Sequence, residues 1–410
     1  MTEDQQTGQS VRVDLADVDL FVSGRHLEAF AWLREHSPIY WNEGVDGSRF
    51  WALTRYEDVH WAYREHASFG SARGAILGGS FRSDHDTAAG RMLVASDLPR
   101  HRLLKQQIAP ALSAAVVDRV GNQVRSLLET AVGRAVAAGG CDFATEIATE
   151  IPAGALMVVF GIGYGEAYHL IGLTRRMVGF RDETFVDTGG DQKLRLAWTQ
   201  AEIFEFFADL LAQRRHKPGD DLITRLLKAE VNGRRMSEED IFFNCMNVAV
   251  GGNETSSYTA CHGIEALISR PDQYEMLRRR PDALNGAIEE MLRWSSVNAY
   301  VQRVTMRDVE RDGHLIRRGD SVTLWNVSAN RDPAQFRDAD RFDVTRSPNR
   351  HLSYGAGIHR CVGAPAAQRE LSLLFRALLD APAPFRLAGE PRRLRSNFIL
   401  GTTSLPLTVG

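Results

Sequence analysis

Apolar residues with helical spacing occupy most of the chain. The stretch "HLEAFAWLREHSP" predicts a helix that ends at Pro38, and "YEDVHWAYREH" predicts another. Between them, "IYWNEGVDGSRFWALTRY" has two aromatic, β-rich runs around a Gly/Asp turn, which predicts a hairpin. From Pro99 to about Arg293 nearly every segment has helical spacing, interrupted only by short Gly- and Asp-rich breaks.

Strand-like alternation returns near the C-terminus. The run "YVQRVTMRDVERDGHLIRRGDSVTLWNVSAN" alternates apolar and polar residues around two tight turns. A last helix over about 362–379 and a short β-like tail follow. The pattern therefore predicts a mainly α fold with a minor β part split between the two ends. No composition shift marks a linker, so we expect one large domain over 1–410, with about residues 1–15 flexible.

Composition narrows the class of protein only a little. The 410 residues are 44% hydrophobic and 25% charged with a net charge of −3, so we expect no nucleic-acid and no membrane partner. The N-terminus lacks the basic and apolar regions of a signal peptide. The most apolar stretch, 154–163, falls short of the about 20 residues that span a bilayer. A soluble, cytoplasmic protein is expected.

One cysteine has an unusual setting. Three of the four cysteines, Cys141, Cys245 and Cys261, are interpreted as buried structural residues. Cys361 instead lies in "HLSYGAGIHRCVG", after glycines that permit close backbone approach and at the start of a predicted helix whose dipole favours a thiolate. An inert thiol or a nucleophile is possible, but no orienting partner and no zinc-ligand spacing is present. A single thiolate in a glycine-lined pocket also suits haem iron.

A predicted buried helix carries residues that cost it stability. "MNVAVGGNETSSYTACHGIEALI" contains two adjacent glycines, Glu254 and Thr255. Each glycine costs about 1 kcal/mol relative to alanine, and a buried carboxylate needs a partner. Such local conflicts concentrate at functional sites, although a kinked helix with a back-bonded threonine is the structural alternative.

These motifs together resemble the cytochrome P-450 family, in its bacterial soluble class. The cysteine stretch is similar to that family's haem-binding loop, and "GGNETS" to its oxygen-activating helix segment. "EMLR" matches its E-x-x-R motif, and "SANRDP", "DADRFDVTRSPNRHLSYG", "DLPRH" and "KPGDDL" follow the same template in the same order. The resemblance covers most of the chain and implies a triangular-prism fold and a haem-thiolate monooxygenase.

The resemblance implies one haem b, with Cys361 as the axial thiolate and metal ligand. It places His101, Arg303 and His359 at the haem propionates, as well as Lys105, which stands where the family often has arginine. Tyr354, Gly355 and Gly363 belong to the haem loop. Tyr354 stands where the family usually has phenylalanine, so its hydroxyl is expected either at the solvated rim or in a hydrogen bond near the thiolate loop.

The resemblance also implies roles in the helices. Gly251 leaves room for oxygen, Thr255 relays a proton, and Glu254 supplies protons from the solvent side. Glu290, Arg293 and Arg341 form a buried structural network beside the haem.

Helical spacing places Asn244, Asn247 and Val248 on the substrate face with Thr255. We expect one asparagine to bind a polar substrate group or both to bond neighbouring helices. The irregular segments 68–97 and 180–190 are interpreted as lids over the substrate. The remaining candidates for the pocket are Ile76, Leu77, Phe81, Val94, Phe180, Ala299 and Ile399.

Electrons must come from another protein, because the chain has no nucleotide fingerprint after a strand and no cysteine cluster. We expect NAD(P)H, a ferredoxin reductase and a ferredoxin to supply a monomeric enzyme. An acidic ferredoxin would dock on a basic face. The candidate residues of this face are Arg100, Arg102, Lys105, Arg350, Arg360 and Arg369.

The expected reaction is insertion of one oxygen atom from O2 into a small or medium organic molecule, by hydroxylation or epoxidation, plausibly in secondary metabolism. The same haem enzyme could instead catalyse desaturation, ring closure or oxidative coupling. A haem protein that binds a ligand without turnover is a further alternative, which the Glu254/Thr255 segment disfavours.

Overall fold

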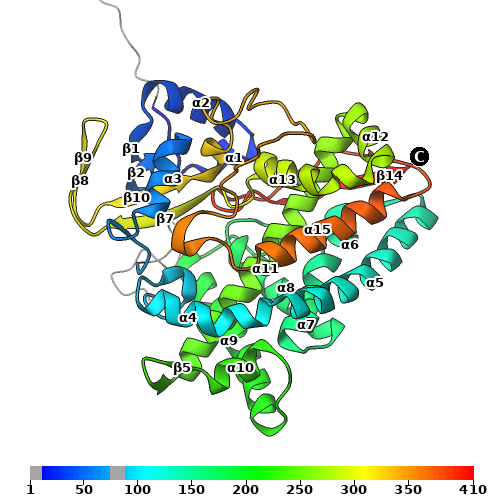
Figure 1. The fold of residues 1–410 in the computed structure, drawn as a ribbon, viewed down its shortest axis with the longest axis horizontal. Helices are drawn as coiled ribbons and strands as arrows, with labels where there is room; N and C mark the ends of the chain where they lie inside the picture. The colour runs from blue at the N-terminus through cyan, green and yellow to red at the C-terminus, as the bar shows by residue number, and fades with distance from the viewer. Residues whose placement is uncertain (1–11, 74–87) are drawn as a thin grey trace, which may run out of the picture.

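The computed structural model describes residues 12–73 and 88–410. Helices form the bulk of the molecule, and a sheet lies at one side (Figure 1). The first part of the chain contains α1 (Val18–Val22), α2 (His26–His36), β1 (Ile39–Glu43), β2 (Arg49–Leu53), α3 (Tyr56–Arg64) and β3 (Phe69–Gly70). The two predicted helices and the predicted hairpin of this region are confirmed.

A long helical region follows. Its elements are η2 (Leu93–Ala95), α4 (Arg100–Ile108), η3 (Ala109–Leu112), α5 (Ala114–Ala138), β4 (Gly140–Asp142), α6 (Phe143–Glu146), α7 (Glu150–Phe160), α8 (Tyr164–Val178), α9 (Gln192–His216), α10 (Leu222–Lys228), β5 (Glu230–Val231), β6 (Arg234–Arg235), α11 (Glu238–Ile268), α12 (Pro271–Arg279), η4 (Pro281–Ala283) and α13 (Leu284–Ser295). The predicted helical character of 99–293 is confirmed, apart from these three short strands.

The last part returns to strands. It contains β7 (Tyr300–Thr305), β8 (Val309–Arg311), β9 (His314–Ile316), β10 (Ser321–Trp325), α14 (Asn326–Ala329), η5 (Gly357–His359), α15 (Ala364–Leu379), β11 (Phe385–Leu387), β12 (Arg392–Arg393), β13 (Thr402–Ser404) and β14 (Pro406–Val409). Helix α15 begins two residues later than the predicted position 362.

The two ends of the chain meet in one sheet. Its order is β1-β2-β10-β7-β3, and β10 pairs in parallel with β2, so that Leu324 lies opposite Leu53. Both leucines are fully buried. The expected β part, split along the sequence, is therefore joined in space, as the blue and yellow strands of Figure 1 show.

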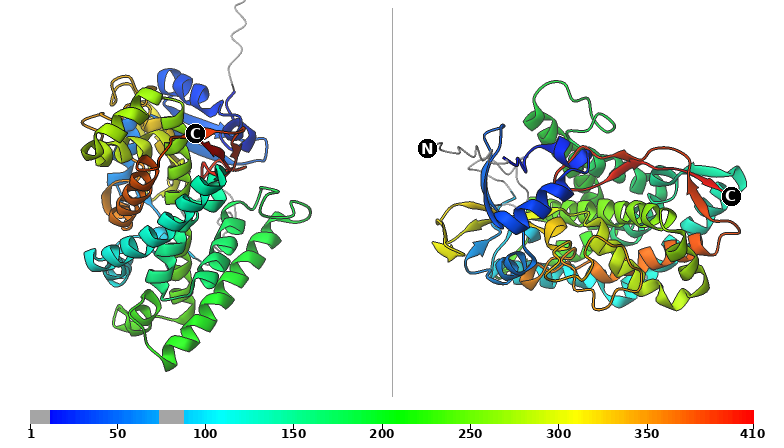
Figure 2. Two further views of the ribbon diagram at one scale, coloured as in Figure 1. Left: turned by 90° about the vertical axis from the view of Figure 1, so that its right-hand side faces the viewer. Right: turned by 90° about the horizontal axis from the view of Figure 1, so that it is seen from above.

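Helix α11 runs through the middle of the helical part (Figures 1 and 2). Its first residue follows Ser237, whose hydroxyl accepts a hydrogen bond from the backbone of Asp240. Three acidic residues in the first turn also stabilise the helix, because their negative charges lie at the positive end of the helix dipole. The helix packs against α7, α8, α13 and α15, so its central residues are placed at the core of the molecule.

Part of the N-terminal segment that we expected to be flexible is packed. Val13 and Leu15 are buried, and the Tyr40 hydroxyl donates to the Val13 carbonyl at 2.8 Å. Residues 1–11 of that prediction lie outside the described residues.

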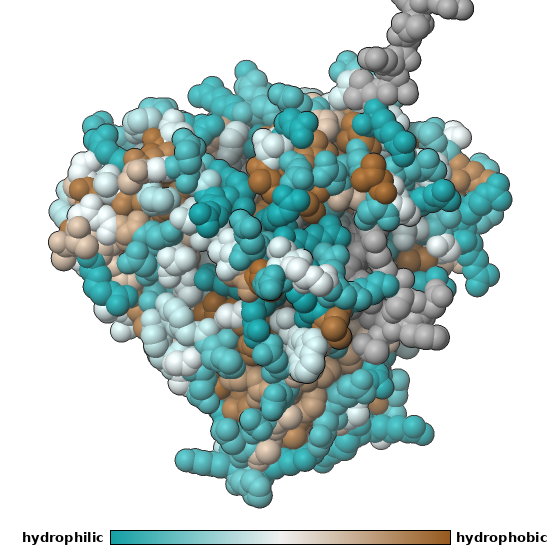
Figure 3. All heavy atoms as spheres, turned by 180° about the vertical axis from the view of Figure 1, so that it is seen from behind, coloured by the Kyte–Doolittle hydropathy of each residue, from teal (hydrophilic) through white to brown (hydrophobic). Residues whose placement is uncertain are grey.

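In the view from behind, hydrophilic side chains predominate on the surface and apolar side chains lie among them, as on an ordinary globular protein (Figure 3). Among the described residues, one window, Phe143–Phe160, is long and apolar enough to cross a membrane by length and composition. However, 72% of it is buried inside the fold, as in a core helix.

Candidate functional site

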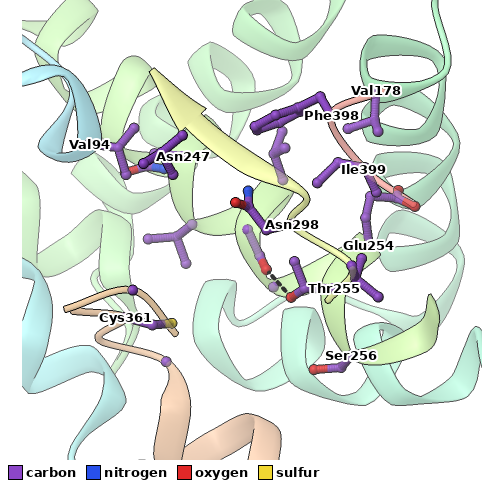
Figure 4. A pocket seen from close by; sticks show the side chains of 18 of the residues that line it. Val94, Val178, Asn247, Glu254, Thr255, Ser256, Asn298, Cys361, Phe398 and Ile399 are labelled. Carbon is purple, nitrogen blue, oxygen red and sulfur yellow. Dashed lines mark hydrogen bonds between the residues drawn. The ribbon is translucent and has the colours of Figure 1, made fainter. Parts of the chain in front are cut away.

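A cavity of about 460 Å³ lies between α11, the cysteine loop and the C-terminal segment around Phe398 (Figure 4). Among the expected pocket residues, the cavity is lined by Val94, Phe180, Asn247, Val248 and Ile399. Leu77 and Phe81, with Ile76, lie outside the described residues. Ala299 is fully buried and does not line the cavity, so its placement there was wrong.

Asn244 is also not a pocket residue. Its side chain is fully buried, accepts a hydrogen bond from the Leu93 backbone and donates to the carbonyls of Arg91 and Asp240. These bonds satisfy the amide and tie α11 to the segment before α4. Asn244 thus bonds to a neighbouring segment, whereas Asn247, which the same alternative included, lines the cavity.

The cysteine loop is shaped by two glycines with left-handed backbone, Gly355 at φ +64° and Gly357 at φ +66°. A Cβ on Gly357 would lie 2.5 Å from the Tyr63 carbonyl, so only glycine fits there. The Cys361 backbone N–H donates to the Tyr354 carbonyl at 2.9 Å and closes the loop. The loop therefore fixes where the cysteine enters the cavity.

The Cys361 side chain is exposed and lines the cavity. Burial raises the pKa of its thiol, whereas the backbone N–H groups of Gly363 and Ala364 at the start of α15 lower it. The same donors would stabilise a sulfur anion that is bound to a cation.

Four basic side chains gather beside this loop. The rings of His101 and His359 lie 4.2 Å apart, and both residues line the cavity with Lys105 and Arg303. Burial, reinforced by the positive neighbours, lowers the pKa of His101 to about 4 and that of His359 to about 2. Lys105 donates to the Ile358 carbonyl at 3.0 Å.

Arg303 is 4% exposed and donates to the Gln302 carbonyl at 2.7 Å. Within the described ranges, none of the four basic residues forms an ion pair. A buried guanidinium without a carboxylate is costly, so this cluster is suited to carboxylates supplied by a bound group.

On the opposite side, α11 stays helical through Gly251 and Gly252. A Cβ at either glycine would meet nothing within 4 Å, so a side chain there would only fill space. The Thr255 hydroxyl donates to the Gly251 carbonyl at 2.7 Å (Figure 4). The back-bonded threonine that was the structural alternative is thus present, and its oxygen can still accept a hydrogen bond.

Glu254 is buried, as its place in a predicted buried helix indicated. It is 1% exposed and lines the cavity. Burial raises the pKa of Glu254, and the charge of Arg175 on α8 opposes this shift. Glu254 therefore lies near α8, and its role in supplying protons from the solvent side stays a prediction.

The Glu290 network was predicted with one wrong member. Arg293 forms a bidentate pair with Glu290 at 2.7 and 2.8 Å, and both side chains are fully buried. The second arginine is Arg346, which donates to Glu290 at 3.1 Å. Arg341 is exposed and contributes only its carbonyl, which accepts from both Arg293 and Arg346.

Tyr354 occupies neither expected position. Its hydroxyl is buried and has no hydrogen-bond partner among the described residues. Burial raises the pKa of Tyr354, and the nearby Glu289 and Cys361 raise it further. The phenol therefore stays neutral.

The predicted basic face is only partly free. Arg102, Arg350 and Arg360 are exposed. Arg100 is paired with Asp240 at 3.0 Å, Lys105 bonds to a carbonyl, and the Nε of Arg369 is buried. The face is therefore smaller than expected.

Several cavity residues were missed by the sequence reasoning. Asn298 and Asn326 lie between the predicted motifs and have no periodic pattern that identifies them. Glu370 on α15 is a buried charge in an apolar helix face, and this anomaly could have been noticed in the sequence.

The chain is similar to known proteins over nearly its whole length. Residues 23–381 match the family model described as Cytochrome P-450. Linalool 8-monooxygenase of Pseudomonas putida is 34% identical over 401 residues, covering 96% of this chain and 98% of the relative.

Two further proteins show the same likeness. Cytochrome P-450 NovI of Streptomyces niveus is 29% identical and covers 97% of this chain and 96% of the relative. The structure of Mycobacterium marinum CYP268A2 in complex with pseudoionone superimposes with a TM-score of 0.89 at 29% identity, covering 97% of this chain and 98% of that chain.

Proposed function

The chain belongs to the cytochrome P-450 family and is a monooxygenase, and we propose that Cys361 ligates its haem iron. The family implies haem b and electrons delivered from outside the chain. The observation that carries the assignment is the position of Cys361, at the start of α15 and open to a cavity that Thr255 also lines.

The described residues fit a haem. Gly355 and Gly357 add no side chains to the cysteine loop, and the four basic residues, which form no ion pair within the described part of the chain, would hold the two propionates. When bound, haem activates O2 for insertion of one oxygen atom, with the thiolate donating electron density to the iron. His101, Lys105, Arg303 and His359 would hold and orient the group from one side.

The residues on α11 would manage protons. Thr255 would accept and pass a proton through its hydroxyl oxygen, while Gly251 holds the hydroxyl in place. Glu254 would act as the proton reservoir, since burial raises the pKa of its carboxyl and so favours the protonated form.

We further propose a cytoplasmic, monomeric enzyme that takes electrons from NAD(P)H through a ferredoxin reductase and a ferredoxin. The exposed Arg102, Arg350 and Arg360 flank the cysteine loop and would receive an acidic partner. Arg100 and Lys105 already have partners and would contribute less to docking.

The proposed reaction is hydroxylation or epoxidation of a small or medium, mainly apolar molecule. Val94, Val248 and Ile399 supply apolar walls. Linalool and pseudoionone, which appear in the names of two similar proteins, are both acyclic isoprenoids with one oxygen atom. They define the substrate class that we propose for this cavity.

The test is the carbon monoxide difference spectrum of the reduced, haem-loaded protein, followed by product analysis with linalool and pseudoionone. A thiolate-ligated iron gives a Soret band at long wavelength. Cys361→His should lose that band but retain haem. The same band in Cys361→His, or a short-wavelength band in the parent enzyme, would contradict the assignment.

A further inference from the structure

The orientation of one cavity amide is fixed by its neighbours. The side chain of Asn298 lies within the cavity, with Val94 and Asn247 on one side and Phe398 and Ile399 on the other (Figure 4). Its backbone carbonyl and its Oδ1 accept hydrogen bonds from Asn326 Nδ2, at 3.2 and 3.3 Å. A backbone carbonyl can only accept, so the atom of Asn326 that faces it must be the nitrogen.

The other end of Asn326 supports the same orientation. Its Oδ1 accepts from the Tyr63 hydroxyl at 2.8 Å, and Asn326 is 1% exposed. Burial raises the pKa of Tyr63 to about 12, so the phenol keeps the proton that it donates. The chain of bonds Tyr63–Asn326–Asn298 therefore engages the Asn298 Oδ1 with the Asn326 amide and leaves Nδ2 as the end of this amide that can bind a ligand.

The Asn298 Nδ2 has no hydrogen-bond partner among the described residues, and it is open to the cavity rather than sealed in the core. A ligand that covers this donor without offering an acceptor leaves the donor desolvated and unpaired, which weakens binding. An acceptor oxygen on the ligand removes that cost. Asn247 also has no hydrogen-bond partner among the described residues, but no bond fixes which end of its amide faces inward.

We propose that Asn298 Nδ2 anchors one acceptor oxygen of an otherwise hydrocarbon substrate, and that Asn326 is a positioning residue that fixes this donor. The substrate class is an isoprenoid-like molecule with a single hydroxyl, ether or carbonyl oxygen. The anchor holds that oxygen, so oxidation occurs at another carbon of the skeleton. This inference rests on the proposed function, because it assigns a role inside the same cavity.

The experiment compares two ligands that differ by one oxygen. Linalool and citronellene, the diene that lacks only its hydroxyl, are titrated into the haem-loaded enzyme, and the shift in spin state gives both dissociation constants. The measured quantity is the ratio of the two constants. Asn298→Leu should reduce the preference for linalool about fivefold to tenfold, the effect of one hydrogen bond.

Two variants separate anchoring from general damage. Asn326→Ala should reduce the ratio in part, because the Asn298 amide can then rotate, whereas a purely structural role would weaken both ligands equally. Asn247→Leu removes an unfixed amide from the same cavity and should change the ratio by less than twofold. Asn298→Ala replaces the leucine variant if that one loses haem.

The outcomes are distinct from those of the proposed function. An unchanged ratio in the Asn298 variants overturns the anchor, even when the carbon monoxide band is intact. Failure of linalool and pseudoionone alike to shift the spin state overturns the substrate class. Absence of the long-wavelength band in the parent enzyme instead overturns the haem-thiolate assignment.

Discussion

The Ser256 hydroxyl on α11 donates a hydrogen bond of 3.0 Å to the carboxylate of Glu370 on α15. Both residues are buried and line the cavity. Burial raises the pKa of Glu370 to about 7, and the Ser256 bond opposes the shift. This pair joins the two helices that carry the oxygen side and the cysteine side of the site.

Glu370 should make stability depend on pH. Its pKa is raised from 4.5 to about 7 on folding, so the folded protein binds more protons between these values. The contribution of neutral Glu370 to the free energy of unfolding is complete below about pH 4.5 and is lost as pH rises through about 7. The loss is on the order of 3 kcal/mol. Glu370→Gln stays neutral and should lack this loss. Urea unfolding at about pH 5 and about pH 8 measures the free energy of unfolding of the parent protein and of Glu370→Gln. An equal decrease between the two pH values in both proteins would refute the role of Glu370.

Replacing the groups proposed to carry protons should uncouple the reaction. Thr255→Val keeps the shape but removes the hydroxyl, and Glu254→Gln removes the titrating proton. Product formation should fall by about tenfold or more while electron consumption continues, since a positioned acid contributes at least that much. The measurement is NAD(P)H consumed against product and hydrogen peroxide formed. Thr255→Ser keeps the hydroxyl and should remain coupled, so equal uncoupling in this variant would count against the role.

Arg346 and Arg341 form a matched pair for the buried network. Arg346→Leu removes a donor from the buried Glu290 and should lower the free energy of unfolding by about 2–4 kcal/mol. Arg341→Leu should cost less than about 0.5 kcal/mol, because its side chain is exposed and its carbonyl remains. Denaturant unfolding measures both. A larger loss of stability in Arg341→Leu than in Arg346→Leu would support Arg341, as the sequence predicted, as the second arginine of the network.

Charge reversal should identify the docking face. Arg102, Arg350 and Arg360, changed together to Glu, should raise the KM for an acidic ferredoxin about tenfold at low salt. The difference should shrink above about 0.1 M salt, where the Debye length is about 10 Å. Arg279→Glu on α12, a single charge reversal that changes the net charge one third as much, should have no effect. If turnover with the ferredoxin changes neither with ionic strength nor in the triple variant, the ferredoxin docks on another face.

The sequence by itself determined the helices, the hairpin and the family. Periodicity is a local property, so the long run of helices from α4 to α13 could be predicted from apolar spacing alone. The cysteine loop was equally predictable, because Gly355 and Gly357 are required by backbone geometry that the motif carries with it. Cys361 and Thr255 were singled out by their local settings, and the Glu290/Arg293 pair by the family resemblance.

Only the tertiary structure decided where individual side chains point. Asn244 and Asn247 lie three positions apart on α11, yet Asn244 is satisfied by the segment before α4 and Asn247 lines the cavity. The choice between Arg341 and Arg346 depends on a loop whose path is set by distant contacts. The orientation of Asn298 is set by Tyr63 and Asn326, from two other parts of the chain. Such contacts depend on which elements pack together, and the spacing of residues along one element does not contain that information.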